Sequence, residues 1–172
     1  TRLAAVDVAI EQASGAHDEM SRAGFNTAYA ADLLARGRAT QAMARDLASR
    51  KRFNEATQYV ELAGAQVQRA HEAAEELPQK RREVEEAVPA LAARIERMKT
   101  TIDEGRALFE RLSAEYAETT WTPIRGNGTE AETRVSWAED ALEGARAAAG
   151  TEQQEGHKAL ELVAAGNESL SA

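Results

Sequence analysis

Apolar residues recur at alternating intervals of three and four positions between Phe53 and Tyr116, and this repeat most constrains the fold of the chain. Such spacing keeps apolar side chains on one narrow face of a helix, which is typical of helices that pack against other helices. No His, Cys, Asp or Glu occupies this face, so the pattern predicts helix packing and indicates no reaction. Its members are Phe53, Ala56, Val60, Ala63, Val67, Ala70, Ala74 and Leu77, then Val84, Val88, Leu91, Ile95, Met98, Ile102, Gly105, Phe109, Leu112 and Tyr116.

The composition of the 172-residue chain agrees with this repeat. Alanine, glutamate and arginine are abundant and proline is sparse, which is typical of long helices. Aromatic residues make up only 5% of the chain, so we expect a thin core in which small side chains let helices approach closely. These features predict an all-α fold, an elongated antiparallel helical bundle or coiled coil of the spectrin-like kind, with about four to six helices in a single domain over residues 1–172.

Glycine and proline residues place the boundaries of the helices. Gly24 predicts a bend or a break, and the pattern leaves open whether residues 3–48 form one helix or two. Pro78 marks a helix end or start and Pro89 a kink or a restart, because proline lacks the amide proton that a helix interior uses. We expect helices at about residues 3–20, 25–48, 53–76, 79–117 with a kink near Pro89, 130–149 and 152–171.

One irregular segment, residues 119–128, separates the long repeat from the next helix. It reads Thr-Thr-Trp-Thr-Pro-Ile-Arg-Gly-Asn-Gly. Thr129 and Glu132 follow in the spacing of a capping box, in which the two side chains satisfy free amides at the start of a helix. We therefore expect this pair to open the helix at about residue 130.

Several classes of binding partner are disfavoured by composition. A net charge of −8 argues against a nucleic-acid surface, which needs concentrated basic residues. No apolar run approaches the roughly 18 residues of a membrane span, so we expect no insertion of this segment into a bilayer. The remaining expectation is a protein partner, or self-association, through helical faces.

The residues that could carry chemistry are scattered. His17, His71 and His157 are far apart in the sequence, and Gln68 and Gln154 stand three positions before the last two, where a di-iron bundle would need glutamate. The chain has no cysteine. Narrow helical seams also provide no concave site that could separate the pKa values of two carboxylates. We therefore predict no catalytic residue, no cofactor, no metal site and no small-molecule substrate, and expect no enzyme.

Four residues in or near the irregular segment are candidates for a site: Trp121, Pro123, Ile124 and Trp137. In one interpretation they anchor a protein partner, because tryptophan is favoured at binding hot spots. In the other, which we prefer, Trp121 and Ile124 fold back onto the bundle beside Tyr116 and lock the loop, and Trp137 completes that lid.

The stretch from Glu115 to Leu142 resembles the C-terminal coiled-coil region of bacterial TPM-domain membrane proteins. That region carries a Tyr-Ala pair, an apolar-Pro-apolar loop, a Gly-Asn pair and a helix that begins at Glu-Ala. The matching residues here are Tyr116-Ala117, Pro123-Ile124, Gly126-Asn127, Glu130-Ala131 and Ala138 with Leu142. The resemblance implies a location on the cytoplasmic face of a bacterial membrane, anchored by a segment absent from this chain.

A second likeness is to the septation-ring regulator EzrA and its spectrin-like repeats. It is carried by Phe53 with Ala56, and by Leu77-Pro78 and Val88-Pro89. The first hypothesis is therefore a non-catalytic helical scaffold or protein-interaction module, the cytoplasmic coiled-coil part of a membrane-anchored envelope protein. The alternative is a spectrin-like regulator of cell division that binds a cytoskeletal polymer.

Overall fold

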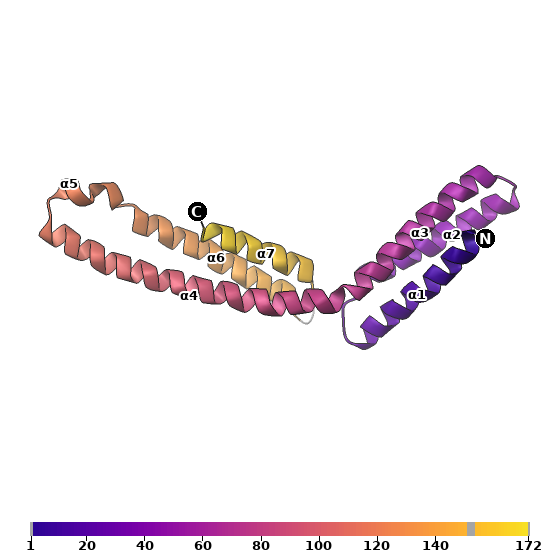
Figure 1. Ribbon diagram of the computed structural model, residues 1–172, viewed down its shortest axis with the longest axis horizontal. Coiled ribbons are helices and arrows are strands. Elements are labelled where there is room, and N and C mark those ends of the chain that lie inside the picture. Colours follow the sequence, from indigo (N-terminus) through magenta and orange to yellow (C-terminus); the bar gives the residue numbers. More distant parts are fainter. Residues whose placement is uncertain (1, 151–153, 172) are drawn as a thin grey trace. The chain divides into compact units, whose positions relative to one another are not determined.

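A computed structural model describes residues 2–150 and 154–171 (Figure 1). Within these ranges every regular element is a helix and none is a strand, which confirms the all-α bundle. The chain divides into two compact units, Thr1–Gln79 and Lys80–Ala172, where the sequence predicted a single domain over residues 1–172. Each unit has its own apolar clusters.

Unit 1 is a bundle of three helices of nearly equal length. Helix α1 spans Arg2–Arg22, α2 spans Ala28–Ser49 and α3 spans Phe53–Glu75. Helix α3 packs against both of the others. The predicted repeat on α3 faces this core, since its buried residues are Ala56, Val60, Ala63, Val67, Ala70 and Ala74.

The two turns of unit 1 both use a residue in the left-handed backbone region. Gly24 has a φ of 80°, and the amide of the next residue, Phe25, donates to the carbonyl of Met20 at 3.0 Å. Residues 3–48 therefore form two helices, separated where glycine permits a conformation that other residues rarely adopt. Lys51 has a φ of 60° and ends α2 in the same way, although it carries a side chain.

Small residues let the helices of unit 1 approach closely. A Cβ atom at Gly37 would lie 2.6 Å from Cγ2 of Val67, so α2 and α3 meet there without room for a side chain. Val67 and Ala63 are both fully buried at this crossing. The abundance of alanine is thus explained by short distances between helices.

Two buried polar side chains interrupt the core of unit 1, and both are satisfied. The Gln41 amide donates to the Asp7 carboxylate at 2.8 Å, and the Thr40 hydroxyl donates to the Gln66 carbonyl oxygen at 2.9 Å. Arg45 also pairs with Asp7, at 2.5 Å. Because a buried polar group is costly without its partner, these bonds specify which residues of α1 and α3 face α2.

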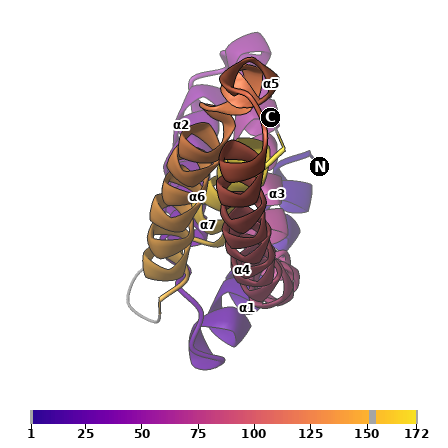
Figure 2. The ribbon, with the colours of Figure 1, turned by 90° about the vertical axis from the view of Figure 1, so that its left-hand side faces the viewer.

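Unit 2 contains helices of very unequal length. Helix α4 spans Leu77–Glu115, with unit 2 starting at Lys80, and α6 spans Asn127–Ala149. Between them lie the short helix α5, Glu118–Trp121, and the 3₁₀ turn η1, Thr122–Ile124. Helix α7, Gly156–Ser169, is the third long element. Seen end-on, α4 and α6 stand side by side, and α7 lies behind them (Figure 2).

The core of unit 2 forms where these three helices meet. Its main cluster consists of Leu91, Ile95, Val135, Ala138, Leu142, Ala145, Val163 and Leu170. Gly166 of α7 approaches both neighbours closely, because a Cβ there would lie 2.8 Å from Cδ2 of Leu91 and 3.3 Å from Cβ of Ala141. Helix α7 therefore sits against α4 and α6 at once.

Both prolines of α4 are accommodated within one helix. Pro78 is its second residue, in the first turn, where no amide proton is needed. Pro89 lies in the interior, and the helix continues through it to Glu115. The restart that Pro89 allowed therefore does not occur.

The structure corrects the sequence predictions for residues 118–132. Residues 119–128 were expected to be irregular, but residues 118–124 form α5 and η1. The capping-box prediction is wrong, because α6 already begins at Asn127 and no side chain caps its first turn. The Glu132 carboxylate pairs with Arg106 of α4 instead.

The last helix also differs from its prediction. Helix α7 begins at Gly156 and ends at Ser169, whereas residues 152–171 were expected, and residues 152 and 153 lie outside the described chain. None of the described helices combines the length and the apolar character needed to cross a bilayer.

Candidate functional site

Trp121 packs back onto α4, as one sequence interpretation predicted. Its ring meets Phe109 edge to face, with 5.6 Å between centroids and an interplanar angle of 83°. The Arg125 guanidinium lies 5.0 Å from the centroid of the same ring. Trp121 is half-buried by these contacts, which close the end of the α4–α6 pair.

The other three candidates do not form a lid with Trp121. Pro123 and Ile124 are exposed, and so is Tyr116. Trp137 lies on α6, three turns into the helix, and 59% of it is exposed. The prediction that Trp137 completes a lid is therefore not met, and this large exposed side chain requires another explanation.

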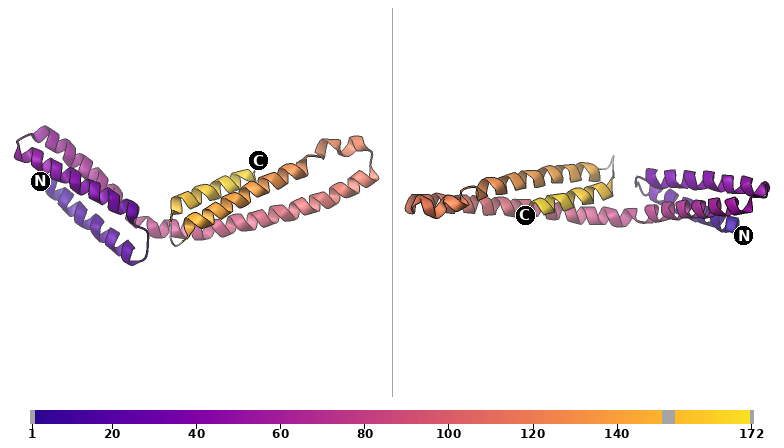
Figure 3. Two further views of the ribbon diagram at one scale, coloured as in Figure 1. Left: turned by 180° about the vertical axis from the view of Figure 1, so that it is seen from behind. Right: turned by 90° about the horizontal axis from the view of Figure 1, so that it is seen from above.

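Helix α7 covers only one part of the α4–α6 pair. Near its C-terminal end, the Arg94 side chain donates to the side chain of Asn167 at 2.8 Å and to the Ser171 hydroxyl at 2.8 Å. Beyond Arg94, α4 continues for about 20 residues to Glu115, and α6 runs beside it. Figure 3 shows α7 ending partway along the two longer helices.

Burial along α4 falls where α7 ends. Val84, Leu91 and Ile95 are buried, and none of the apolar residues that follow on α4 is. Leu108 is 50% exposed and Tyr116, just past the helix, is 55% exposed. The apolar repeat thus continues into a region where only two long helices are present.

The uncovered residues lie on the same side of α4 and α6 that α7 occupies. On α4, α7 contacts Leu91 and Arg94, and steps of three, four or seven residues from these positions stay on one helical face. On α6, α7 contacts Ala141, and Trp137 lies one turn earlier on that face. We call this surface the open face. It consists of Met98, Thr101, Gly105, Leu108 and Leu112 on α4, of Tyr116 just past the end of that helix, and of Arg134 and Trp137 on α6.

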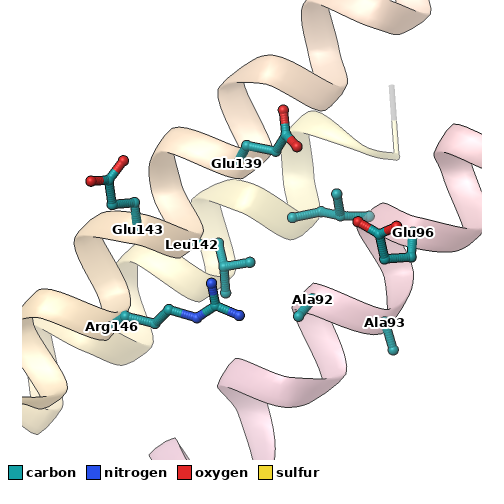
Figure 4. A pocket seen from close by; sticks show the side chains of 8 residues that line it. Ala92, Ala93, Glu96, Glu139, Leu142, Glu143 and Arg146 are labelled. Carbon is teal, nitrogen blue, oxygen red and sulfur yellow. The ribbon is translucent and has the colours of Figure 1, made fainter.

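A polar groove also lies between α4 and α6 (Figure 4). At one end, Lys99 pairs with Glu139 at 2.6 Å and with Glu96 at 3.0 Å. The hydrogen bond that Lys99 donates to Glu139, and after it the one to Glu96, raises the pKa of Lys99 above its ordinary value. The residues that line the groove are Ala92, Ala93, Ile95, Glu96, Glu139, Leu142, Glu143 and Arg146. Lys99 thus pairs with two of the three glutamates that line this groove.

The histidines make local contacts within each unit. His17 lies 3.0 Å from the Asp18 carboxylate and 3.1 Å from the Thr27 hydroxyl, where it joins the end of α1 to the start of α2. His157 pairs with Glu161 one turn later in α7. Among the described residues, no three metal-ligating side chains gather in one place.

Comparisons of the chain with protein-family models, curated proteins and solved structures give no match. The open face therefore rests on geometry alone. Sequence reasoning placed Leu112 and Tyr116 in the seam and missed Leu108, which stands beside the seam residue Phe109. The adjacent apolar pair Leu108 and Phe109 was the available signal in the sequence.

Proposed function

We propose that this chain is a non-catalytic helical protein-interaction module that binds a partner helix on the open face. The observation that carries the proposal is the loss of burial along α4 where α7 ends, while the apolar repeat continues. A partner helix on the open face would lie in line with α7 and would contact α4 and α6 as α7 does.

The chemistry of the open face suits a helix with an apolar stripe. Leu108, Leu112 and Tyr116 offer aliphatic and aromatic contacts at helical spacing, which is how grooves between helices recognise amphipathic partners. Trp137 would be the main anchor, because tryptophan contributes strongly to binding when a partner desolvates it. Gly105 leaves space beside these residues, since nothing lies within 4 Å of the position of its missing Cβ.

The location at the cytoplasmic face of a bacterial membrane is part of the same proposal. Its support is the resemblance of residues 115–142, which includes the tip that Trp121 closes. The alternative, a regulator that binds a cytoskeletal polymer, would use the open face for a helix of that polymer.

A labelled synthetic peptide tests the binding role. The probe is an amphipathic helix of three heptads with leucine at its a and d positions, and fluorescence anisotropy reports its binding. We expect Leu112→Glu and Trp137→Ser to weaken binding about tenfold or more, because each removes apolar contact area from the open face. Protein is used at a concentration at which sedimentation shows one chain.

The matched control is Tyr29→Ser, which removes an aromatic side chain that is 67% exposed in unit 1. This variant should bind the peptide as the wild type does. Equal binding by the wild type and both open-face variants would rule out the proposal, and so would an equal loss in the control.

A further inference from the structure

We propose that the open face binds the same face of a second copy of this chain, with the two α4 helices antiparallel. This inference rests on the proposed function and names the partner helix. The α4 helix of each copy would lie on the α4–α6 pair of the other copy, in line with α7 and beyond its end. The two α4 helices and the two α6 helices would then form a four-helix bundle. Such an interface uses the same surface twice and closes on itself.

The apolar residues of the open face complement one another in this arrangement. From Met98 to Leu112 the positions of the open face follow alternating steps of three and four, and this alternation is the same in both chain directions. Centring the pair between Gly105 and Leu108 puts Leu108 of each copy opposite Gly105 of the other. Leu112 then lies opposite Thr101. Large side chains thus meet small ones, which is how helices interdigitate.

Trp137 gains a contact from the same alignment. Ion pairs from Arg106 to Glu132 and from Lys99 to Glu139 give the register of α4 against α6. In this register Trp137 lies level with Thr101, the position where Leu112 of the second copy would sit. The second copy therefore covers the exposed tryptophan.

Charges beside the open face favour the antiparallel direction. Arg97, Glu104 and Arg111 follow each other at intervals of seven, and each directly precedes an open-face residue. All three are exposed, and none has an ion pair among the described residues. In the antiparallel pair, Glu104 of each copy faces Arg111 of the other. Flanking charges of this kind set the orientation of paired helices.

Charge reversal tests the inference. Sedimentation velocity over a wide concentration range should show a wild-type dimer. In Glu104→Arg two arginines meet at each pair, and in Arg111→Glu two glutamates meet, so each variant should dimerise about tenfold more weakly or worse. Circular dichroism checks that both variants remain helical.

The decisive measurement mixes the two variants. At positions 104 and 111, one copy then carries two arginines and the other carries two glutamates. Each contact between position 104 of one copy and position 111 of the other therefore joins opposite charges again. Native mass spectrometry should show the mixed dimer in excess over both homodimers, and Glu104→Arg with Arg111→Glu in one chain should dimerise like the wild type. Glu86→Arg, an exposed reversal on α4 before the open face, should leave the dimer unchanged.

Three results would overturn the inference: a wild-type monomer at all concentrations, a wild-type dimer that the reversals leave intact, or failure of the mixture to pair. The peptide experiment separates these results from failure of the proposed function. A monomer that binds the peptide through Leu112 and Trp137 keeps the interaction module and rejects the second copy as its partner.

Discussion

The two units contain three long helices each, and they differ in how far the third helix reaches. In unit 1, α1, α2 and α3 have 21, 22 and 23 residues, so each covers the whole length of its neighbours. In unit 2, α4, α6 and α7 have 39, 23 and 14 residues. Helices of matched length bury the seam of α3 from Ala56 to Ala74, whereas the short third helix of unit 2 leaves the later part of the α4 seam open.

The apolar repeat itself is equally regular in both units. On α3 it is buried from Ala56 to Ala74. On α4 the last buried residue is Ile95, although the spacing continues unchanged to Leu112. An apolar repeat therefore predicts a helical face that can be buried, and the reach of the neighbouring helix decides whether it is.

The largest expected effect contrasts two leucines of α4. Leu91→Ala should lower the free energy of unfolding of unit 2 by about 2–5 kcal/mol, because Leu91 is fully buried against α7. Leu112→Ala should cost less than about 1 kcal/mol in the monomer, since its side chain already contacts water. Both tryptophans lie in unit 2, so tryptophan fluorescence in urea reports its unfolding. If the two variants lost equal free energy of unfolding at a concentration at which the protein is monomeric, the comparison would be contradicted.

A second contrast concerns ion pairs in the two units. Asp7→Ala should destabilise unit 1 by about 1–3 kcal/mol, because it leaves the buried amide of Gln41 without its acceptor. Glu139→Ala removes a pair with Lys99 that is open to water, so it should change unit 2 much less. Hydrogen exchange of α1 and α2 amides measures the first effect, and tryptophan fluorescence the second. A larger loss in Glu139→Ala would refute this difference.

Much of this arrangement could be predicted from the sequence. The helix boundaries follow from glycine and proline, as at Gly24 and Pro78, because these residues act on the local backbone. The buried face of α3 follows from its spacing, because one period serves the whole helix. The contact of Trp121 with the bundle was also predicted, since a short connection keeps it near α4.

The open face could not be predicted in this way. It depends on how far α7 extends along α4, which is a relation between distant segments that neither sequence pattern contains. The exposure of Trp137 follows from the same relation, and its spacing beside a seam suggested a lid instead. The capping box failed for a similar reason, because Arg106 of α4 takes the carboxylate of Glu132.

A smaller effect compares two glycines in helices. Gly37→Ala should destabilise unit 1 by about 1 kcal/mol, because crowding against Cγ2 of buried Val67 outweighs the better helix propensity of alanine. Gly105→Ala should stabilise unit 2 by roughly 0.5–1 kcal/mol, because open space surrounds that position. Hydrogen exchange of α2 and α4 amides measures both changes. Destabilisation at both positions would contradict the open space around Gly105, and stabilisation at both would contradict the crowding at Gly37.

The smallest expected effect is a pH dependence at the border between the covered and open parts of α4. Hydrogen bonds that Lys99 donates to Glu139 and Glu96 raise the pKa of Lys99, so folding favours its protonated form. Its stabilisation of unit 2 is therefore complete below the ordinary lysine value of 10.5 and is lost as the pH rises through the higher folded value. Lys99→Met should be less stable than the wild type at neutral pH and equal to it in strong alkali. The Lys99–Glu139 pair is open to water, so this difference in stability is small. Glu139→Gln should make the pH dependence smaller still, because Glu139 is the main cause of the raised pKa of Lys99. If the difference in stability between the wild type and Lys99→Met stayed constant through this pH range, the effect of Lys99 would come from packing and not from its charge.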